Sequence, residues 1–385
     1  MRILVLTRLD QYETYFLGSN KGSETVPELP ESQGQYFWIE ALRDLGHNVE
    51  VVRYTDPVFP SPCRSAKLQV WAKQTFGIGY RAALKLRRSL PTRIDLEYQA
   101  RNRRIVDRIE SFDPQLLLVV GGYHQLRANT FERIQANCDT TIIGMTGTGP
   151  FDYGTPTERS IAPQYYDAMF VNDDHRMHAW RGVGANAEVL PVSAAPIEFA
   201  RRNCSQNNKF ASDVSFIGQP YPRRVEYLEP LIDLEIDLAL YGSGWEETPL
   251  HEYHRGSAWG GDMIRAIYNS KISINIHHRV MLTGGNMKQF EIPAAKTLQI
   301  SDACGAGWFE DGEEIVLVDS PIELQEAVGY YLDADEEREQ IAIAGHERAA
   351  SDHTYHDRMR EVIERVRTGV GRQDGVVNPR YLRYD

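Results

Sequence analysis

The segment GGNMKQFE places two glycines, an amide, a cation and a carboxylate within eight positions. These residues are Gly284, Gly285, Asn286, Lys288 and Glu291. Backbone amides at the glycines and a lysine ammonium are groups that bind a diphosphate. A carboxylate can accept two hydrogen bonds from a ribose diol. Because an unpaired buried charge is costly, Glu291 ahead of an almost uncharged run either faces solvent or meets the hydroxyls of a ligand.

Two other apolar runs also end in glycine. In FIGQPYPRR, Gly218 ends the run and Arg224 stands at the start of a helical pattern, where helix amides and an arginine favour an anion. An ordinary turn with arginines in solvent fits the same pattern. In LYGSGW, Gly242, Ser243 and Gly244 end the next run without the spacing of a dinucleotide fingerprint. A base or ribose can lie against such a backbone, so both turns are candidate nucleotide contacts.

Histidines and acidic residues at further strand ends are candidates for catalysis. His124 follows the run LLLVVGG and can titrate near neutral pH, which makes it the candidate general base, with a surface histidine as the alternative. Asp152 and Asp173 are further candidates for that role. His277 opens the stretch HHR and is a candidate phosphate contact. Neither this stretch nor NDDH has the ligand spacing of a zinc site.

The bulk composition excludes several classes of protein. A net charge of −12 argues against non-specific binding to nucleic acid. Hydrophobic residues make up 42% and charged residues 25%, as in soluble globular proteins. The longest apolar runs are strand-length, so no transmembrane segment is expected. The N-terminus, MRILVLTRLD, lacks the features of a signal peptide, which predicts a cytoplasmic protein.

The four cysteines are predicted to be reduced thiols. They are Cys63, Cys138, Cys204 and Cys304. Their wide separation, without any C-x-x-C pair, favours neither a disulfide framework nor a zinc site.

The elements that must position these residues alternate along the chain. Apolar runs predict strands at 2–7, 48–54, 115–122, 140–147, 168–173, 187–193, 213–218, 237–242, 272–277, 297–302 and 314–319. Amphipathic patterns predict helices at 35–46, 99–114, 223–232 and 261–270, with three more closing the chain. Such alternation builds parallel, doubly wound sheets. Irregular polar sequence at 196–208 separates two α/β halves, and ligands are expected in the cleft between them, at the carboxyl ends of the strands.

Four stretches, in their order and spacing, resemble the C-terminal half of the CgeB-like family, named for a spore-maturation protein. They are FIGQPYPRRVEYLEPLI, IYNSKISINI, NMKQFEIPAAKTLQISD and HTYHDRMREVI. The family consists of predicted glycosyltransferases of the GT-B fold, and the resemblance covers about residues 210–365. It implies two Rossmann-like doubly wound domains facing across a cleft: an acceptor-binding domain at 1–200 and a donor-binding domain at 201–370. Residues 371–385 would form a tail.

The resemblance also implies roles for single residues. Glu291 matches the glutamate that holds the donor ribose, and Arg224 matches an arginine of the first loop that contacts the diphosphate. Lys288 stands where the family commonly has arginine. Gly284 stands in place of an earlier glutamate, and Lys296 in place of a usual glycine. Retaining and inverting transfer both stay open.

The implied co-substrate is a nucleotide-diphosphate sugar, with no cofactor and no metal, as is usual for this fold. The acceptor is an unidentified glycan, lipid-linked molecule or protein, and no nucleic acid is expected to bind. A nucleotide-sugar epimerase on the same fold is one alternative, although the long aromatic stretch at 8–33 favours an acceptor. Another is a degenerate member that only binds a glycan or a coat partner. A periplasmic binding protein is disfavoured by the missing signal peptide.

Overall fold

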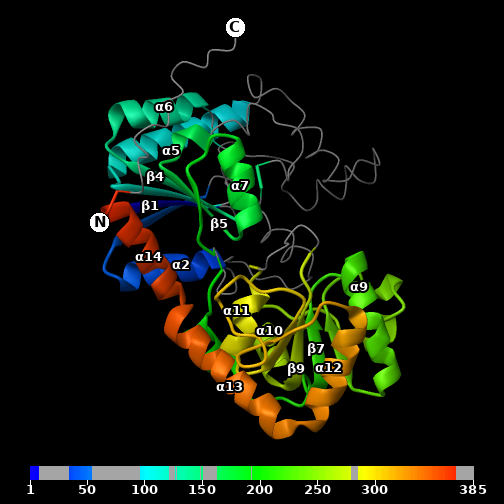
Figure 1. The fold of residues 1–385 in the computed structure, drawn as a ribbon. Coiled ribbons are helices and arrows are strands. Elements are labelled where there is room, and N and C mark those ends of the chain that lie inside the picture. The colour runs from blue at the N-terminus through cyan, green and yellow to red at the C-terminus, as the bar shows by residue number, and fades with distance from the viewer. Residues whose placement is uncertain are drawn as a thin grey trace, which may run out of the picture.

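Two parallel β-sheets, each with helices packed on both faces, organise the described part of the chain (Figure 1). The computed structural model describes residues 1–7, 34–53, 96–120, 126, 128–147, 149–150, 163–191, 193–278 and 285–369. The predicted α/β class, with two Rossmann-like halves, is confirmed. None of the helices within these ranges is both long and apolar enough to cross a membrane.

The first sheet has the strand order β2-β1-β3-β4-β5-β6, and all its pairs are parallel. Its strands are β1 (Arg2–Thr7), β2 (Asn48–Arg53), β3 (Leu116–Val120), β4 (Thr141–Thr146), β5 (Ala168–Val171) and β6 (Ala187–Val189). One face is covered by α2 (Gly34–Asp44) and α14 (Tyr355–Arg367). The other is covered by α5 (Leu96–Phe112), α6 (Ala128–Asn137) and α7 (Asp174–Gly182).

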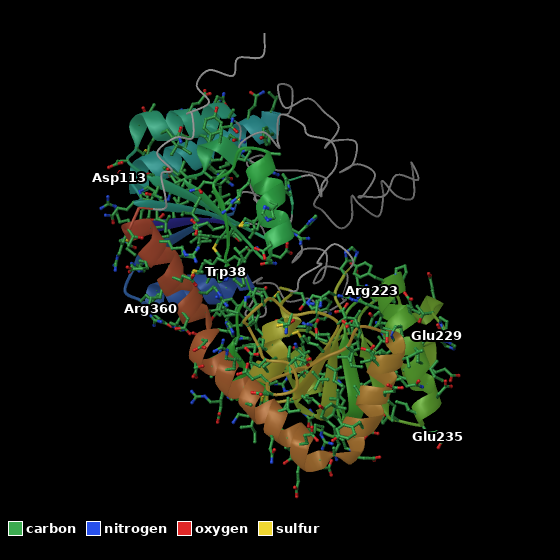
Figure 2. The ribbon with its side chains drawn as sticks, in the orientation of Figure 1. Trp38, Asp113, Arg223, Glu229, Glu235 and Arg360 are labelled. Carbon is green, nitrogen blue, oxygen red and sulfur yellow. The ribbon has the colours of Figure 1, made fainter. Side chains whose placement is uncertain are left out.

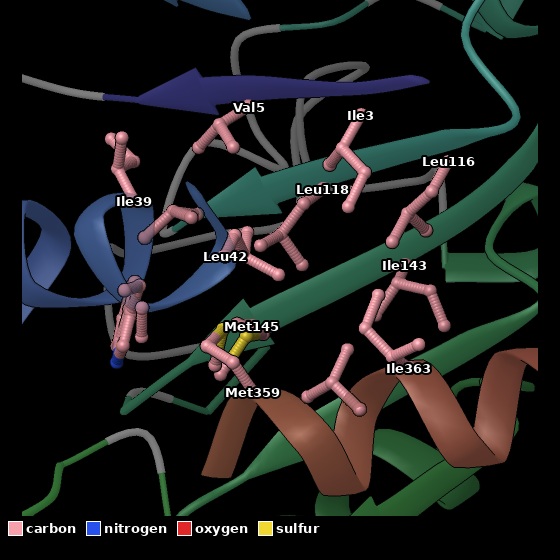
Figure 3. Packing of buried hydrophobic residues seen from close by; sticks show 14 of the residues in the cluster. Ile3, Val5, Ile39, Leu42, Leu116, Leu118, Ile143, Met145, Met359 and Ile363 are labelled. Carbon is pink, nitrogen blue, oxygen red and sulfur yellow. The ribbon is translucent and has the colours of Figure 1, made fainter. Parts of the chain in front are cut away.

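Burial on both faces explains why these strands are apolar almost without interruption. In β1, Ile3 and Val5 pack toward α2 and α14, whereas Leu4 and Leu6 pack toward α5 and α6. Figure 3 shows the first of these clusters at close range. Alternate side chains of one strand therefore serve two separate cores, and neither face tolerates a polar residue without cost.

The last helix of the chain belongs to the core of the first sheet. Met359 and Ile363 of α14 pack among the strand side chains, as Figure 3 shows. The predicted domain boundary at residue 200 instead assigns this helix to the donor-binding domain at 201–370. A capping box between Thr354 and Asp357 starts α14, and a parallel bridge joins Thr354 to Ala195 where the chain first leaves the first half. The chain thus crosses between the halves twice at neighbouring positions.

The second sheet has the order β11-β10-β9-β7-β8 and is also parallel throughout. Its strands are β7 (Ser212–Ile217), β8 (Leu238–Tyr241), β9 (Ser270–Asn275), β10 (Leu298–Ser301) and β11 (Val316–Leu317). One face packs against α9 (Pro222–Leu228) and α12 (Pro321–Asp333). The other packs against α8 (Ile197–Asn203), α10 (Gly261–Tyr268) and α11 (Lys288–Ala294). The long α13 (Asp335–Asp352) lies beside α11 and β10.

The expectation of irregular chain at 196–208 was wrong, because α8 occupies much of it. The helix buries only Phe199 and Ala200, while Arg201 and Arg202 in its last turn are exposed. Phe199 meets Phe37 of the first half edge to face, with ring centroids 5.4 Å apart. So short an apolar face leaves little periodic signal in a sequence.

Candidate functional site

The loops at the carboxyl ends of the two sheets meet at Gly285. This glycine has a φ of 110°, and a Cβ built on it would lie 3.1 Å from Cβ of Asn172 and 3.3 Å from Cη2 of Trp308. Asn172 directly follows β5 of the first sheet, whereas Gly285 precedes α11 of the second. The described residues of this segment, 285–291, therefore begin where the halves touch. Figure 2 shows Arg223 toward the upper end of the second half, the end nearer the first half.

The carboxylate of Glu291 is buried and paired with a lysine from its own helix. Its side chain is 2% exposed, and Oε2 lies 2.6 Å from Nζ of Lys288, one helical turn earlier. The Nζ also lies 3.1 Å from the sulfur of Met263. Burial raises the pKa of the Tyr355 hydroxyl, and the nearby Glu291 carboxylate raises it further. The charge of Lys288 therefore offsets part of the free-energy cost of burying the Glu291 carboxylate, and lone pairs of the carboxylate are left for a ligand.

Asn286 fixes the start of α11. Its Nδ2 donates to Oδ1 of Asn275 at the end of β9, at 2.6 Å, and its Oδ1 accepts from the backbone N–H of Gln289 at 3.0 Å. Because helix interiors exclude proline, Pro293 predicts a helix that starts late, near Gln289 or Phe290, or that is kinked; the helix begins at Lys288. It runs only to Ala294, so Pro293 stands in its last turn. The loop amide thereby ties the Lys288–Glu291 pair to the central strand of the sheet.

Lys296 occupies a backbone conformation that favours glycine. Its φ is 59°, just beyond the end of α11, where helices often end in a left-handed residue. The family resemblance marks this position as a usual glycine. The substitution therefore keeps the local turn and adds backbone strain.

The glycines after β7 and β8 serve a close approach between two loops. A Cβ on Gly242 would lie 2.2 Å from the carbonyl oxygen of Gly218. That oxygen also accepts from Nε1 of Trp245 at 2.9 Å. The N–H groups of Gly218, Gly242 and Gly244 donate to Tyr241, Gly256 and Glu246, respectively. Gly218 was expected to let a phosphate approach the backbone, and Gly242 and Gly244 were expected to lie against a base or ribose, but all three amides already have acceptors within the protein. Ser243, between the last two glycines, is exposed.

Arg224 bridges two strand ends and keeps donors for a ligand. Its Nε donates to the carbonyl of Ile276 at 2.8 Å, and its Nη1 donates to that of Gln219 at 3.1 Å. Its guanidinium also lies over the rings of Phe216 and Tyr221. Burial lowers the pKa of Arg224. A guanidinium carries five N–H groups, so contacts within the described chain still leave Nη2 to bind an anion.

His277 is paired with an acidic residue that the sequence analysis overlooked. Its Nδ1 lies 2.7 Å from Oδ1 of Asp302, which also accepts the backbone N–H of His277 at 2.9 Å. Asp302 follows β10, and its side chain is 2% exposed. Arg223 donates to Oδ2 of Asp302 through Nε at 3.0 Å. Although burial opposes ionisation, the hydrogen bonds and charge of His277 and the charge of Arg223 together lower the pKa of Asp302. The available signal was one aspartate directly after an apolar run.

On the first sheet, Asp173 has a structural explanation. Its carboxylate accepts the N–H of Arg176 and so caps α7, and its Oδ2 lies 2.5 Å from Nη1 of the same arginine. The side chains are 1% and 3% exposed. Three other predicted site residues, His124, Asp152 and Gly284, lie outside the described residues. Within the described ranges, no cluster of three or more acidic, histidine or cysteine side chains could hold a metal ion.

Comparison with known proteins identifies the fold. HepE from Anabaena, in complex with UDP-glucose, is similar over 96% of this chain and 100% of its own, with a TM-score of 0.59 and 11% identity. A glycosyltransferase from Rickettsia africae ESF-5 is similar over 96% of this chain and 99% of its own, with a TM-score of 0.59 and 12% identity. The fold is GT-B.

Two further comparisons complete this result. MnaA from S. aureus, solved with UDP, covers 96% of this chain and 97% of its own at 11% identity, with a TM-score of 0.51. Residues 223–364 match the family model described as "Glycosyl transferase-like". The matched segment runs from α9 to α14 and so contains Arg224, Lys288 and Glu291, the charged residues that follow strand ends of the second sheet. Comparison with curated proteins gives no match.

Proposed function

We propose that the protein is a glycosyltransferase of the CgeB-like group, which moves a sugar from a nucleotide-diphosphate sugar to an acceptor hydroxyl. The observation that carries this proposal is the charged edge of the second half, where Arg224, Lys288 and Glu291 follow strand ends opposite the first half. The family match over residues 223–364 supports it. The similar structures of HepE and MnaA contain UDP-glucose and UDP, which favours a UDP-linked donor.

In this proposal the donor replaces contacts that the protein now makes with itself. The diphosphate attracts the ammonium of Lys288 and the free Nη2 donors of Arg224, and the ribose diol takes the lone pairs of Glu291. Lys288 would then give up Glu291 for the diphosphate, and Glu291 would give up Lys288 for the ribose of the same ligand. The whole proposed donor set is Gly218, Arg224, Gly242, Ser243, Gly244, His277, Gly284, Gly285, Asn286, Lys288 and Glu291.

The acceptor is proposed to bind the first half, with its hydroxyl within about 3–3.5 Å of the anomeric carbon. Should the transfer invert configuration, His124 is the proposed base. A retaining transfer would depend instead on charge stabilisation of the departing diphosphate. No cofactor or metal has a part in the proposed reaction. A cytoplasmic location is part of the proposal.

A thermal-shift screen against UDP, GDP, CDP, ADP and dTDP tests the proposal first. A ligand that binds only the folded protein stabilises it by about 2.7 kcal/mol at a hundredfold excess over Kd. We expect one diphosphate to raise Tm clearly and its nucleoside to raise Tm less. The matching nucleotide sugar should then release that diphosphate when acceptor extracts are added. If none of the five raises Tm, the proposed function is wrong.

A further inference from the structure

One nitrogen of His277 is buried without a partner among the described residues. Nδ1 is held by Asp302, but Nε2 is enclosed and meets no hydrogen-bonding atom in that part of the chain, and the whole residue is only 2% exposed. Buried polar atoms are rarely left in this state unless a ligand or a water completes them. His277 stands directly after Ile276, whose carbonyl holds Arg224, so the unpaired nitrogen belongs to the same strand end as a proposed diphosphate contact.

Asp302 fixes the orientation of the imidazole. Its Oδ1 accepts from both the backbone N–H and Nδ1 of His277, while its Oδ2 is held by Nε and Nη2 of Arg223. With Nδ1–H donating to a carboxylate, Nε2 carries a lone pair in the neutral ring and a proton in the imidazolium. Only in the imidazolium is Nε2 a donor, and that donor is charged.

We propose that Asp302 positions His277 so that its protonated Nε2 donates a hydrogen bond to the diphosphate of the bound donor. The inference rests on the proposed function and gives His277 a definite role within it. During transfer, the bond between the anomeric carbon and the diphosphate oxygen breaks, and its electron pair stays on that oxygen. The acceptor oxygen forms the new bond to carbon and passes its proton to the general base of an inverting transfer, or to the departing diphosphate oxygen in a retaining one. His277 keeps its own proton and stabilises the added negative charge through the hydrogen bond.

The charges around His277 bear on the direction in which donor affinity should change with pH. Asp302 from the end of β10 carries a negative charge beside His277, Arg223 and Arg224 from α9 carry positive charges, and His278 is the next residue in the chain. A bound nucleotide sugar adds two negative charges, which interact more favourably with an imidazolium than with a neutral ring. Because the proposal has the imidazolium bind the diphosphate, donor affinity should fall as the pH rises, and binding should take up a proton wherever the free imidazole is neutral.

Calorimetry with UDP-glucose tests this, because its two phosphates do not titrate near neutral pH. Titrations between pH 6 and 8, in two buffers of different ionisation enthalpy, measure the proton taken up. Wild type should take up a proton over this range. His277→Gln should abolish the uptake and weaken UDP-glucose binding about tenfold, the loss of one charge-assisted hydrogen bond. Asp302→Asn should keep the contact with Nδ1 through its amide oxygen but remove the carboxylate charge, so the pH dependence of affinity should change.

His356→Gln is the matched control. His356 also pairs with an aspartate, Asp44, at 3.0 Å, but both side chains are largely exposed and they join α14 to α2. This variant should behave as wild type. Unchanged proton uptake in His277→Gln, or an unchanged pH profile in a folded Asp302→Asn variant, overturns the inference. So does wild-type protein that fails to bind UDP-glucose, and the screen of five nucleotides then decides separately whether the proposed function fails as well.

Discussion

The two halves share a fold but handle a buried carboxylate differently. In the first half, Asp173 caps α7 and pairs with Arg176, whose side chain is only 3% exposed. In the second half, Glu291 pairs with Lys288, whose side chain is 20% exposed at the start of α11, three residues after the glycine that touches the other half. Both pairs are three residues apart in sequence. The first is closed to any ligand, whereas the second has a cation that can change partners.

This difference separates a structural ion pair from a candidate binding pair. When both side chains of an ion pair are buried, removing one of them lowers the stability of the protein, because the remaining buried charge loses that partner. A pair with one reachable partner loses less, since water or a ligand can take the vacated place. Removing Asp173 from the first half should therefore change mainly stability. Removing a charge of the Lys288–Glu291 pair from the second half should change mainly ligand binding.

Asp173→Ala should have the largest effect on stability. It breaks a buried ion pair and removes the cap of α7, so we expect a loss of roughly 3–5 kcal/mol in the free energy of unfolding. Urea denaturation measures it. Nucleotide affinity of the folded fraction should not change. Glu198→Ala is the control, because its pair with Arg201 in α8 has the same spacing but lies in solvent. Equal losses for the two variants would contradict the comparison.

Gly242→Ala should come next. Its Cβ would lie 2.2 Å from the backbone oxygen of Gly218, and its φ is 135°, so we expect a loss of roughly 2–4 kcal/mol from clash and strain. Gly46→Ala in the first half is the control. There φ is 82° and nothing lies within 4 Å, so only the left-handed strain of about 1 kcal/mol should appear. Denaturation of both variants gives the difference, and a mild Gly242 variant would refute the close approach of these loops.

Lys288→Ala and Arg224→Ala should act on binding more than on stability. Each should weaken the binding of a nucleoside diphosphate by roughly 1–3 kcal/mol, the value of a hydrogen bond to a charged group. Binding of the corresponding nucleoside should weaken much less. Glu291→Gln should weaken both ligands alike, because the ribose is common to them. Calorimetry with each pair of ligands measures these values. If the lysine variant loses both ligands equally, Lys288 does not contact phosphate.

The sequence predicted most of this fold because each buried strand is a short apolar run. The same reasoning could not place α14, since an amphipathic helix carries no record of which sheet covers it. Nor could it join His277 to Asp302, which lie 25 residues apart and meet only because β9 and β10 are neighbours. The Lys288–Glu291 pair was within reach of the sequence. With the helix expected to begin at 289 or 290, however, the two residues did not share a helical turn.

Lys296→Gly should give the smallest effect, and in the opposite direction. Lys296 after α11 and Asp113 after α5 both have a positive φ, 59° and 50°, so the halves offer a matched pair of strained helix ends. Lys296 is exposed, and its backbone favours glycine. We expect a gain of about 0.5–1 kcal/mol, because the relief of left-handed strain exceeds the added entropy of the unfolded chain.

Asp113→Gly should gain less than Lys296→Gly. Aspartate tolerates the left-handed region better than lysine does, and Asp113 also holds Arg2 of β1 at 2.7 Å. Denaturation midpoints of both variants decide the matter. If Asp113→Gly proved the more stabilising, the strain at Lys296 would be smaller than its φ indicates. In that case the glycine implied by the family resemblance would need an explanation other than backbone conformation, such as close approach of a ligand to the end of α11.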